Sequence, residues 1–276
     1  MEPKRSILQL GSIKNWVTSK KQYMKKVLAF DLDDTLAVTK SPISDEMAEV
    51  LGEVLNYFDV CVISGSRFEQ FVIQIIDRLP LYATRLKRLH LMPTCDTRYY
   101  RYNEDLKEWD LQYAEGLTVD QKAKMSAVLE SSAKELGLWP ENPAGELIED
   151  RQSQLTYSAL GQQVTLADKY AWDLDSSKKL AVRNLAAPQL PGLEVRVGGA
   201  TSVDVTRVGI DKAYGMQKLI DALGITKEDI LFFGDKLGEG GNDYPVKAFG
   251  IESIEVSHQE DTVEKLKEIL KNQGGV

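Results

Sequence analysis

Three short apolar runs, each followed by an acidic or small residue, dominate the hydrophobic pattern of the chain. The runs are KVLAF (26–30), DVCVIS (59–64) and DILFFG (229–234). Continuous apolar runs of this length are typical of parallel strands that are buried on both faces. Helical patterns beside them, at 45–58 and 212–223, complete the signature of an α/β fold with a doubly wound, mostly parallel sheet. Since the carboxyl ends of such strands converge on one edge, we expect Asp31, Ser64 and Asp235 to meet there.

The pattern changes between about residues 94 and 207, where apolar and polar residues alternate. The alternating segments are TRYYRY (97–102), GELIED (145–150), QLTYSAL (154–160), LEVRVGG (193–199) and SVDVT (202–206). Alternation is typical of strands with one solvated face, and two helical patterns, at about 118–137 and 174–186, are interleaved. We therefore expect a separate α+β cap domain with an antiparallel sheet. It would comprise residues 94–207, inserted into a core domain of residues 1–93 and 208–276.

Composition narrows the possible partners and the compartment. The net charge of -8 opposes binding to a nucleic-acid backbone, and no apolar run reaches the ~18 residues of a membrane helix, so we expect neither partner. The first 26 residues are basic, but no continuous apolar stretch follows them, so we expect no secretory signal. With Cys61 and Cys95 as its cysteines, the chain needs no disulfide, and we expect a cytoplasmic protein. The sequence leaves the oligomeric state open.

The segment DLDDT brings Asp31, Asp33 and Asp34 to the end of a buried strand. A calcium loop of the EF-hand type is excluded, because its sixth and twelfth positions, which need Gly and Glu, are Leu36 and Pro42. A helix N-cap at Asp33 or Asp34 is an alternative, but capping does not need three carboxylates. Crowded carboxylates are stabilised by a cation among them, and Mg²⁺ prefers such oxygen ligands. This arrangement suits aspartyl-phosphate chemistry.

The histidine content limits the alternatives. His90 and His258 are the only histidines, which excludes a site of several histidines around zinc and makes Ser-His-Asp chemistry a poor fit. The glycine-rich segment GEGGND does not have the spacing of a dinucleotide-binding loop, and Gly238, Gly240 and Gly241 fit a tight turn instead. Any bound metal is therefore expected to have oxygen ligands.

Four segments resemble the motifs of the haloacid dehalogenase (HAD) superfamily, in the same order. They are DLDDT (31–35), VISGS (62–66), GIDK (209–212) and FFGDKLGEGGND (232–243). The insert of about a hundred residues resembles the α/β cap of one branch of that superfamily. Within that branch, GDK followed by GGNDY, and GGATSVDV before GIDK, are similar to the eukaryotic-type phosphomannomutases.

The resemblance implies roles for particular residues. Asp31 would be the nucleophile, and Asp33 would protonate the leaving oxygen and then deprotonate the attacking water. Mg²⁺ would be held by the Asp31 side chain, the Asp33 carbonyl and Asp235. Phosphoryl oxygens would be neutralised by Thr35, Ser64 and Lys212, and the substrate would be contacted by Arg151, Ser202, Asp204 and Asn242. The residues themselves leave an alternative for Arg151, which can pair with Glu149 or Asp150.

Two positions depart from the family pattern, in which an arginine of the cap is followed eleven and eighteen residues later by two more. Arg151 matches the first arginine, whereas Gln162 and Lys169 occupy the later positions. A mutase has to hold a bisphosphate by either end, which bidentate arginine does better than an amide or a lysine. The sequence therefore favours a Mg²⁺-dependent phosphatase for a small phosphorylated metabolite such as a sugar phosphate. The alternatives are a phosphomannomutase and, third, a non-catalytic sugar-phosphate sensor. In each enzyme, we expect the cap to close on the core as a hinge when substrate binds.

Overall fold

The structure, a computed structural model, describes residues 25–79, 85–94 and 97–273. Cys95 and most of the basic N-terminal segment, residues 1–24, lie outside these residues. The chain divides into two compact units, one of residues 1–112 with 211–276 and the other of residues 113–210. Among the described residues, we find no helix with the length and hydrophobicity of a membrane span.

The first unit contains a seven-stranded sheet within the described residues, in the order β11-β10-β1-β2-β3-β4-β5. The strands are β1 (Val27–Phe30), β2 (Asp59–Ile63), β3 (Leu89–Met92), β4 (Arg98–Asn103), β5 (Glu108–Ala114), β10 (Ile230–Gly234) and β11 (Glu252–Glu255). From β11 to β3 every pairing is parallel, whereas β4 is antiparallel to β3. The predicted α/β class with a mostly parallel sheet is confirmed.

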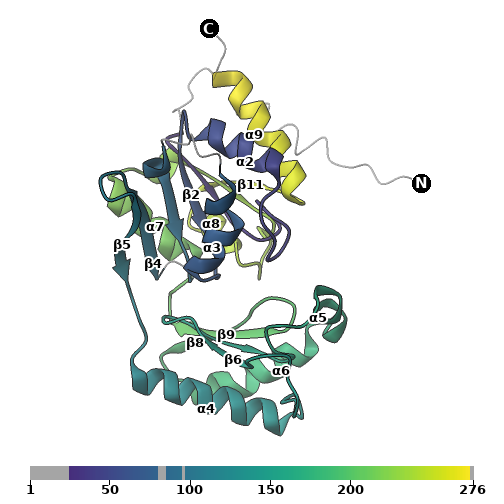
Figure 1. Cartoon of the computed structure of the whole chain (residues 1–276). Helices are drawn as coiled ribbons and strands as arrows, with labels where there is room; N and C mark the ends of the chain where they lie inside the picture. The colour runs from purple at the N-terminus through teal and green to yellow at the C-terminus, as the bar shows by residue number, and fades with distance from the viewer. Residues whose placement is uncertain (1–24, 80–84, 95–96, 274–276) are drawn as a thin grey trace, which may run out of the picture. The chain divides into compact units, whose positions relative to one another are not determined.

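Helices cover both faces of this sheet (Figure 1). They are α2 (Asp45–Val54), α3 (Phe68–Gln74), α7 (Lys212–Leu223), α8 (Tyr244–Ala248) and α9 (Gln259–Gln273), with 3-10 turns η1 (Ile76–Arg78), η2 (Leu86–Arg88) and η4 (Lys227–Asp229). The apolar residues of α2, α3 and α9 pack in one cluster with alternate residues of the strands. The intervening strand residues, such as Val27 and Phe232, are also fully buried but lie outside that cluster. They face the opposite side of the sheet, which we assign to α7 and α8.

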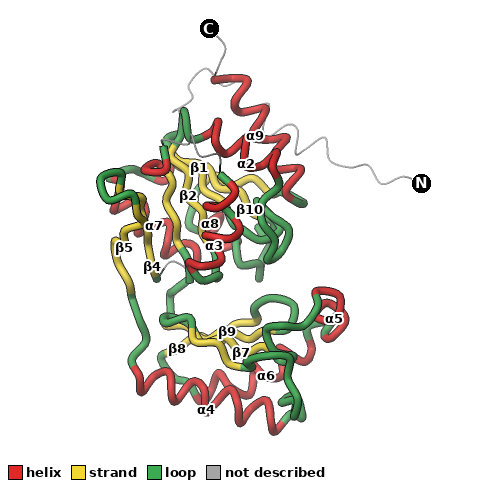
Figure 2. The backbone as a smooth tube through the Cα atoms, in the orientation of Figure 1, coloured by secondary structure: helices red, strands yellow, loops and turns green. Residues whose placement is uncertain are grey.

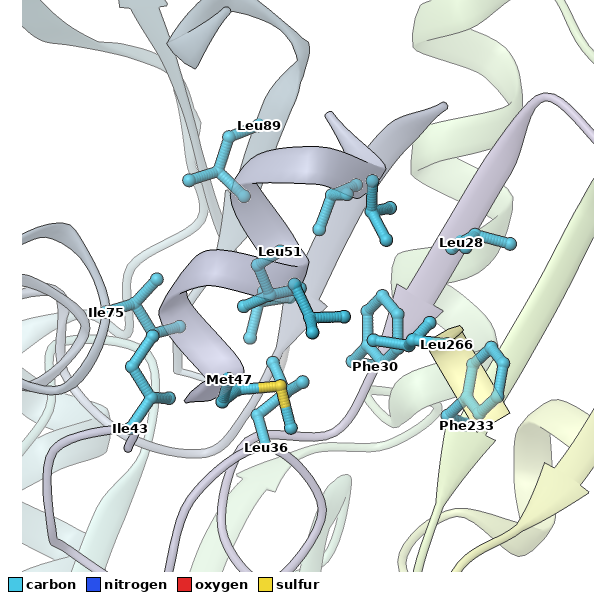
Figure 3. Packing of buried hydrophobic residues seen from close by; sticks show 14 of the residues in the cluster. Leu28, Phe30, Leu36, Ile43, Met47, Leu51, Ile75, Leu89, Phe233 and Leu266 are labelled. Atoms are coloured by element: carbon cyan, nitrogen blue, oxygen red, sulfur yellow. The ribbon is translucent and has the colours of Figure 1, made fainter. Parts of the chain in front are cut away.

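Figure 3 shows the packing on the first face, where Met47 and Leu51 of α2 lie toward Phe30 of β1 and Leu266 of α9. The rings of Phe30 and Phe233, from adjacent strands, are stacked with centroids 4.9 Å apart. Helix α2 begins after Ser44, whose side chain accepts a hydrogen bond from the Met47 amide, as expected for an N-cap serine. This packing holds the ends of β1 and β10 side by side.

The second unit has a four-stranded sheet in the order β6-β7-β9-β8, with antiparallel pairings. Figure 2 shows the strands of this unit in yellow and its helices in red. Its elements are α4 (Val119–Glu135), β6 (Ile148–Asp150), β7 (Leu155–Ser158), α5 (Leu166–Trp172), α6 (Ser177–Ala186), η3 (Ala187–Gln189), β8 (Leu193–Val197) and β9 (Ser202–Arg207). Buried side chains of α4 and α6 pack against Leu155, Val195 and Val203 on one face. The opposite face, which carries Thr156 and Asp204, is polar, as the alternation predicted.

The compact units divide later along the chain than the predicted domain boundary near residue 94, because β4 and β5 belong to the seven-stranded sheet. Tyr100 of β4 lies opposite Leu91 of β3, so the alternating segment 97–102 extends the first unit. The second unit begins at Tyr113 and ends at Ile210, a few residues beyond the predicted limit of 207. Alternation reports that a strand has one buried face, and it contains no information about which sheet the strand joins.

Candidate functional site

The candidate site lies where the order of the parallel strands reverses. Strand β1 has β2 on one side and β10 on the other, so chain connections leave it in opposite directions. Such a switch point opens a crevice beyond the carboxyl ends of the strands. Asp31 follows β1 directly, and its amide donates to the Phe233 carbonyl of β10 at 2.9 Å. Asp235 follows β10, so these two aspartates are brought together as predicted.

Lys212 joins this group from the start of α7. The helix is capped by Asp211, whose side chain accepts hydrogen bonds from the amides of Ala213 and Tyr214. The Lys212 side chain is almost completely buried, and its Nζ lies 2.5 Å from Asp31 Oδ1. Asp211 is therefore the second important residue of the GIDK motif, because its cap fixes the start of the helix and thereby the position of Lys212.

Asp243 is a site residue that the sequence analysis did not identify. It has no exposed surface, and its Oδ1 lies 2.5 Å from Lys212 Nζ. Its Oδ2 accepts a hydrogen bond from the Lys236 amide at 3.0 Å, which ties it to the loop after β10. A Cβ on Gly234 would lie 2.5 Å from Asp243 Oδ2, so the glycine permits this close approach. The signal in the sequence was the second aspartate of FFGDKLGEGGND, directly after the predicted contact Asn242, which is exposed.

The charges of this cluster do not balance. Burial, followed by the repulsion of Asp243 and Asp235, raises the pKa of Asp31 to about 7 despite the attraction of Lys212. Burial alone would lower the pKa of Lys212, but Asp243 and Asp31 outweigh burial and hold it above its ordinary value. Asp31 and Asp243 share the buried ammonium of Lys212, and Asp235 pairs with Lys236 at 2.8 Å. Three carboxylates thus face two ammonium groups, and the site attracts a proton or a further cation.

The donor set fits a hard cation. One carboxylate oxygen from each of Asp31, Asp235 and Asp243 lies within 4.8 Å of the others. Among the buried side-chain atoms that the structure describes, Asp235 Oδ1 and Thr35 Oγ1 have no hydrogen-bond partner. An unpartnered buried oxygen is costly, and a metal ion or a phosphoryl group would satisfy these two.

Asp33 and Asp34 are not among the three carboxylates of this cluster, although the sequence analysis grouped them with Asp31. Asp34 has a left-handed backbone conformation (φ 63°), which reverses the chain, and its carboxylate accepts hydrogen bonds from the Thr39 amide and hydroxyl. The carboxylate of Asp33 is bound by Lys40 and Gln74. Neither aspartate is an N-cap, because Ser44 caps the helix that follows.

Ser64 follows β2 and Thr35 lies in the loop after β1, so both belong to the same carboxyl edge of the sheet as Asp31. Both side chains are buried, and Ser64 Oγ accepts a hydrogen bond from the Ser66 amide at 3.2 Å. The Thr35 carbonyl accepts from the Thr262 hydroxyl at 2.7 Å, which anchors the loop after β1 to α9. These hydroxyls supply neutral donors beside the charged groups.

The predicted contacts of the second unit lie on its polar sheet face. Ser202 and Asp204 sit two residues apart on β9, and Asp204 Oδ1 accepts a hydrogen bond from Thr156 at 2.7 Å. Arg151 donates to Glu149 Oε2 from Nε and from its terminal nitrogen, at 2.8 and 2.7 Å, which is the pairing that the residues alone allowed. Gln162 donates to Ser158 Oγ at 3.0 Å, and Lys169 donates to the Gln162 carbonyl at 3.2 Å.

Comparison with known proteins identifies a family and relatives. The family model described as "PMM: Eukaryotic phosphomannomutase" matches residues 94–272. The chain is 27% identical over 262 residues to "Probable phosphomannomutase" of Caenorhabditis elegans, covering 90% of this chain and 96% of that protein. It is 25% identical over 268 residues to "Phosphomannomutase 1" of Homo sapiens, covering 87% and 90% respectively.

Solved structures support the fold. A haloacid dehalogenase-like hydrolase from Bacteroides thetaiotaomicron superposes with a TM-score of 0.60 at 16% identity, covering 89% of this chain and 99% of that one. The IMP-bound, N-terminally truncated IMP-nucleotidase of Plasmodium falciparum superposes with a TM-score of 0.66 at 16% identity, covering 95% and 71%. At this level of identity the two comparisons concern the fold alone.

Proposed function

Because the chain belongs to the eukaryotic phosphomannomutase family of the HAD superfamily, we propose that it is a hexose-phosphate mutase. It would move a phosphoryl group between the 1- and 6-hydroxyls of a hexose by way of an aspartyl phosphate on Asp31. This choice reverses the preference of the sequence analysis for a phosphatase, since the family and the named relatives favour the alternative.

The observation that carries the proposal is the position of Lys212 between Asp31 and Asp243, 2.5 Å from each. A buried carboxylate next to a fixed ammonium is suited to attack phosphorus, because the ammonium neutralises both the nucleophile and the phosphoryl oxygens. Thr35 and Ser64 would donate hydrogen bonds to those oxygens. Positioning and charge stabilisation account for most of the catalysis in phosphoryl transfer.

The proposed reaction has two halves, and Asp33 transfers one proton in each. Asp31 forms an Oδ–P bond while the P–O bond to the sugar breaks, and Asp33 gives its proton to the departing sugar oxygen. In the second half, a hydroxyl of the sugar phosphate attacks phosphorus, Asp33 takes its proton, and the Oδ–P bond of Asp31 breaks. One residue thus serves as acid and then as base, as microscopic reversibility requires.

We further propose Mg²⁺ as the cofactor, held by the carboxylates of Asp31 and Asp235 and by the carbonyl of Asp33. The fit rests on the excess of carboxylates over ammonium groups and on the unpartnered Asp235 Oδ1. When bound, the ion supplies positive charge to the nucleophile and the phosphoryl group.

Arg151, Ser202, Asp204 and Asn242 remain proposed contacts of the sugar phosphate. Asp204 and Ser202 offer hydrogen bonds to sugar hydroxyls, and Arg151 offers a cation for a phosphate. Binding energy from these groups would orient the reacting phosphate, so that the chemical step depends on the correct sugar.

A phosphatase is the second candidate, and the residues at 162 and 169 favour it. Gln162 carries no charge, and Lys169 offers a point charge where a mutase of this family has arginines. In a phosphatase, water would replace the sugar hydroxyl in the second half of the reaction.

A coupled assay of hexose 1-phosphate to 6-phosphate conversion, with Mg²⁺ and a hexose bisphosphate as activator, tests the proposal. We expect isomerisation with little phosphate release, and Asp31→Asn should lower the rate by roughly 10³-fold or more while the fold is kept. Phosphate release without isomerisation would select the phosphatase. Wild-type turnover that survives in Asp31→Asn would refute both candidates.

A further inference from the structure

Asp33 is held by a set of donors that the proposed steps do not use. Its Oδ1 accepts hydrogen bonds from the Lys40 amide at 2.9 Å and from Gln74 Nε2 at 3.1 Å. Its Oδ2 lies 3.4 Å from Lys40 Nζ. Both carboxylate oxygens are therefore bound, by Lys40 of the same loop and by Gln74 of α3, which is distant in sequence.

The orientation of the Gln74 amide is fixed by its surroundings. Gln74 has no exposed surface, and Nε2 also donates to the Ser41 carbonyl at 2.8 Å. Since both neighbours are acceptors, the amide nitrogen and not the oxygen has to face them. The buried Gln74 side chain is thus fixed with its amide nitrogen toward the Asp33 carboxylate.

These contacts also connect the loop to the neighbouring elements. Lys40 Nζ donates to Ser66 Oγ at 2.5 Å, two residues after Ser64 at the end of β2. The carbonyl of Gln74 accepts a hydrogen bond from the Ile43 amide at 2.9 Å. The loop that carries Asp33 is thereby tied to β2 and to the end of α3.

We propose that Lys40 and Gln74 are positioning residues for Asp33, which hold its carboxylate where a sugar oxygen can exchange a proton with it. The inference rests on the proposed function, in which Asp33 is the acid and base. The Asp33 side chain is partly exposed, and without these donors it would rotate among its staggered conformations. Displacement by about 1 Å is enough to impair a transfer that depends on geometry.

A positioning role and a structural role predict different effects on two kinds of phosphoryl donor, those whose leaving group needs a proton and those whose leaving group does not. A sugar oxygen leaves as a strong base and needs the Asp33 proton as the P–O bond breaks. The p-nitrophenolate of p-nitrophenyl phosphate and the acetate of acetyl phosphate are weak bases that leave without a proton. Loss of positioning should therefore slow the sugar phosphate selectively, whereas damage to the phosphoryl site would slow every donor.

The experiment compares kcat for a hexose phosphate with the rate of Asp31 phosphorylation by p-nitrophenyl phosphate or acetyl phosphate, followed by intact mass. Since acid–base catalysis contributes 10²–10⁴-fold, we expect Lys40→Met and Gln74→Leu each to lower kcat by about 10-fold or more and phosphorylation by less than about 2-fold. Lys40→Arg should recover most of the loss. Lys267→Met, which removes a surface ion pair with Glu46, is the matched control.

Two outcomes would overturn the proposal. Equal losses on both kinds of donor, or none on the sugar phosphate, would exclude selective positioning of Asp33. A double-mutant cycle adds an independent criterion, because Lys40→Met should cost little more once Asp33→Ala is present, and additive losses would place Lys40 elsewhere. If Gln74→Leu does not fold, the kinetics of the variants at the exposed Lys40 test the proposal. Survival of phosphorylation in Asp31→Asn would refute the proposed function itself and not the positioning.

Discussion

The Nζ atom of Lys212 lies 2.5 Å from Oδ1 of Asp243, a carboxylate with no exposed surface. The same ammonium lies 2.5 Å from Asp31, so the lysine is shared between a proposed nucleophile and a residue that takes no part in bond formation. Asp243 holds the lysine beside Asp31, and Asp243 is itself held by the backbone amide of Lys236. It sets the charge at the centre of the site.

The first prediction follows from this sharing. In Asp243→Asn, the ammonium of Lys212 loses its second anionic partner and with it its fixed position, which should lower kcat by ~100-fold, the scale of one preorganised electrostatic group. Because Asp31 remains as a partner, the free energy of unfolding should fall by only about 1–3 kcal/mol. Steady-state kinetics and urea denaturation measure the two effects, with Asp221→Asn, an exposed partner of Gln217, as the control. Wild-type activity in Asp243→Asn would show that the residue only supports the fold.

The second prediction concerns the cation. After treatment with EDTA, addition of Mg²⁺ should raise the melting temperature of the wild type, because the ion relieves the repulsion among Asp31, Asp235 and Asp243. At a concentration 100 times Kd, binding contributes about 2.7 kcal/mol, which corresponds to several degrees. Asp235→Asn should abolish most of this shift, whereas Asp204→Asn on the second sheet should keep it. A shift that is the same in both variants would place the ion elsewhere.

The third prediction uses two adjacent glycines as a matched pair. A Cβ at Gly198 would lie 2.5 Å from both Asp204 Oδ2 and Ser202 Oγ, so Gly198→Ala has to displace the two proposed sugar contacts. We expect KM for the hexose phosphate to rise about 10-fold, the loss of roughly one charged hydrogen bond. At Gly199, a Cβ would meet Ser202 Oγ at 3.6 Å, an ordinary contact, so Gly199→Ala should behave as the wild type. Equal KM values in the two variants would remove Ser202 and Asp204 from the substrate site.

The fourth prediction concerns pH and His90, which is buried between β2 and β4. Burial, as the largest influence, lowers the pKa of His90, although Asp59 near Nε2 opposes this. Burial also raises the pKa of the Tyr99 hydroxyl, which stays protonated and lies 2.6 Å from His90 Nδ1. The unfolded chain therefore binds a proton near pH 6.5 that the folded chain does not. As the pH falls below about 6.5, the stability contributed by neutral His90 is lost, by at most ~1.4 kcal/mol per pH unit.

The measurement compares urea unfolding of the wild type and His90→Gln between pH 5 and 7.5. The lowered pKa of Asp59 acts only below its ordinary value of 3.8, outside this range. The raised pKa of Asp31 acts in the opposite direction, since its folded form holds a proton that the unfolded form loses, but it is common to both proteins. The difference in unfolding free energy should shrink as the pH falls, and a constant difference would show that His90 does not titrate on unfolding.

The loop after β1 separates what the sequence revealed about the site from what it concealed. The apolar run 26–30 fixed Asp31 at the end of a buried strand, and that prediction required only local periodicity. The three aspartates nevertheless do not form one cluster. Asp33 is bound by Lys40 and Gln74, and Asp34, whose backbone is left-handed, is bound by Thr39. A left-handed backbone is uncommon at a residue other than glycine, so the sequence did not predict this conformation at Asp34.

By itself the sequence determined the α/β class, the buried strands with Asp31 and Asp235 at their ends, and Lys212 at the start of a helix. Hydrophobic period and the order of motifs along the chain are sufficient for these predictions. Only the tertiary structure decided that Asp243 shares Lys212, that Gln74 and Lys40 hold Asp33, and that β4 joins the core sheet. Each of these contacts joins residues that are not neighbours along the chain. Such pairings are selected by packing and by the cost of burying unpaired charge, which no single stretch of sequence contains.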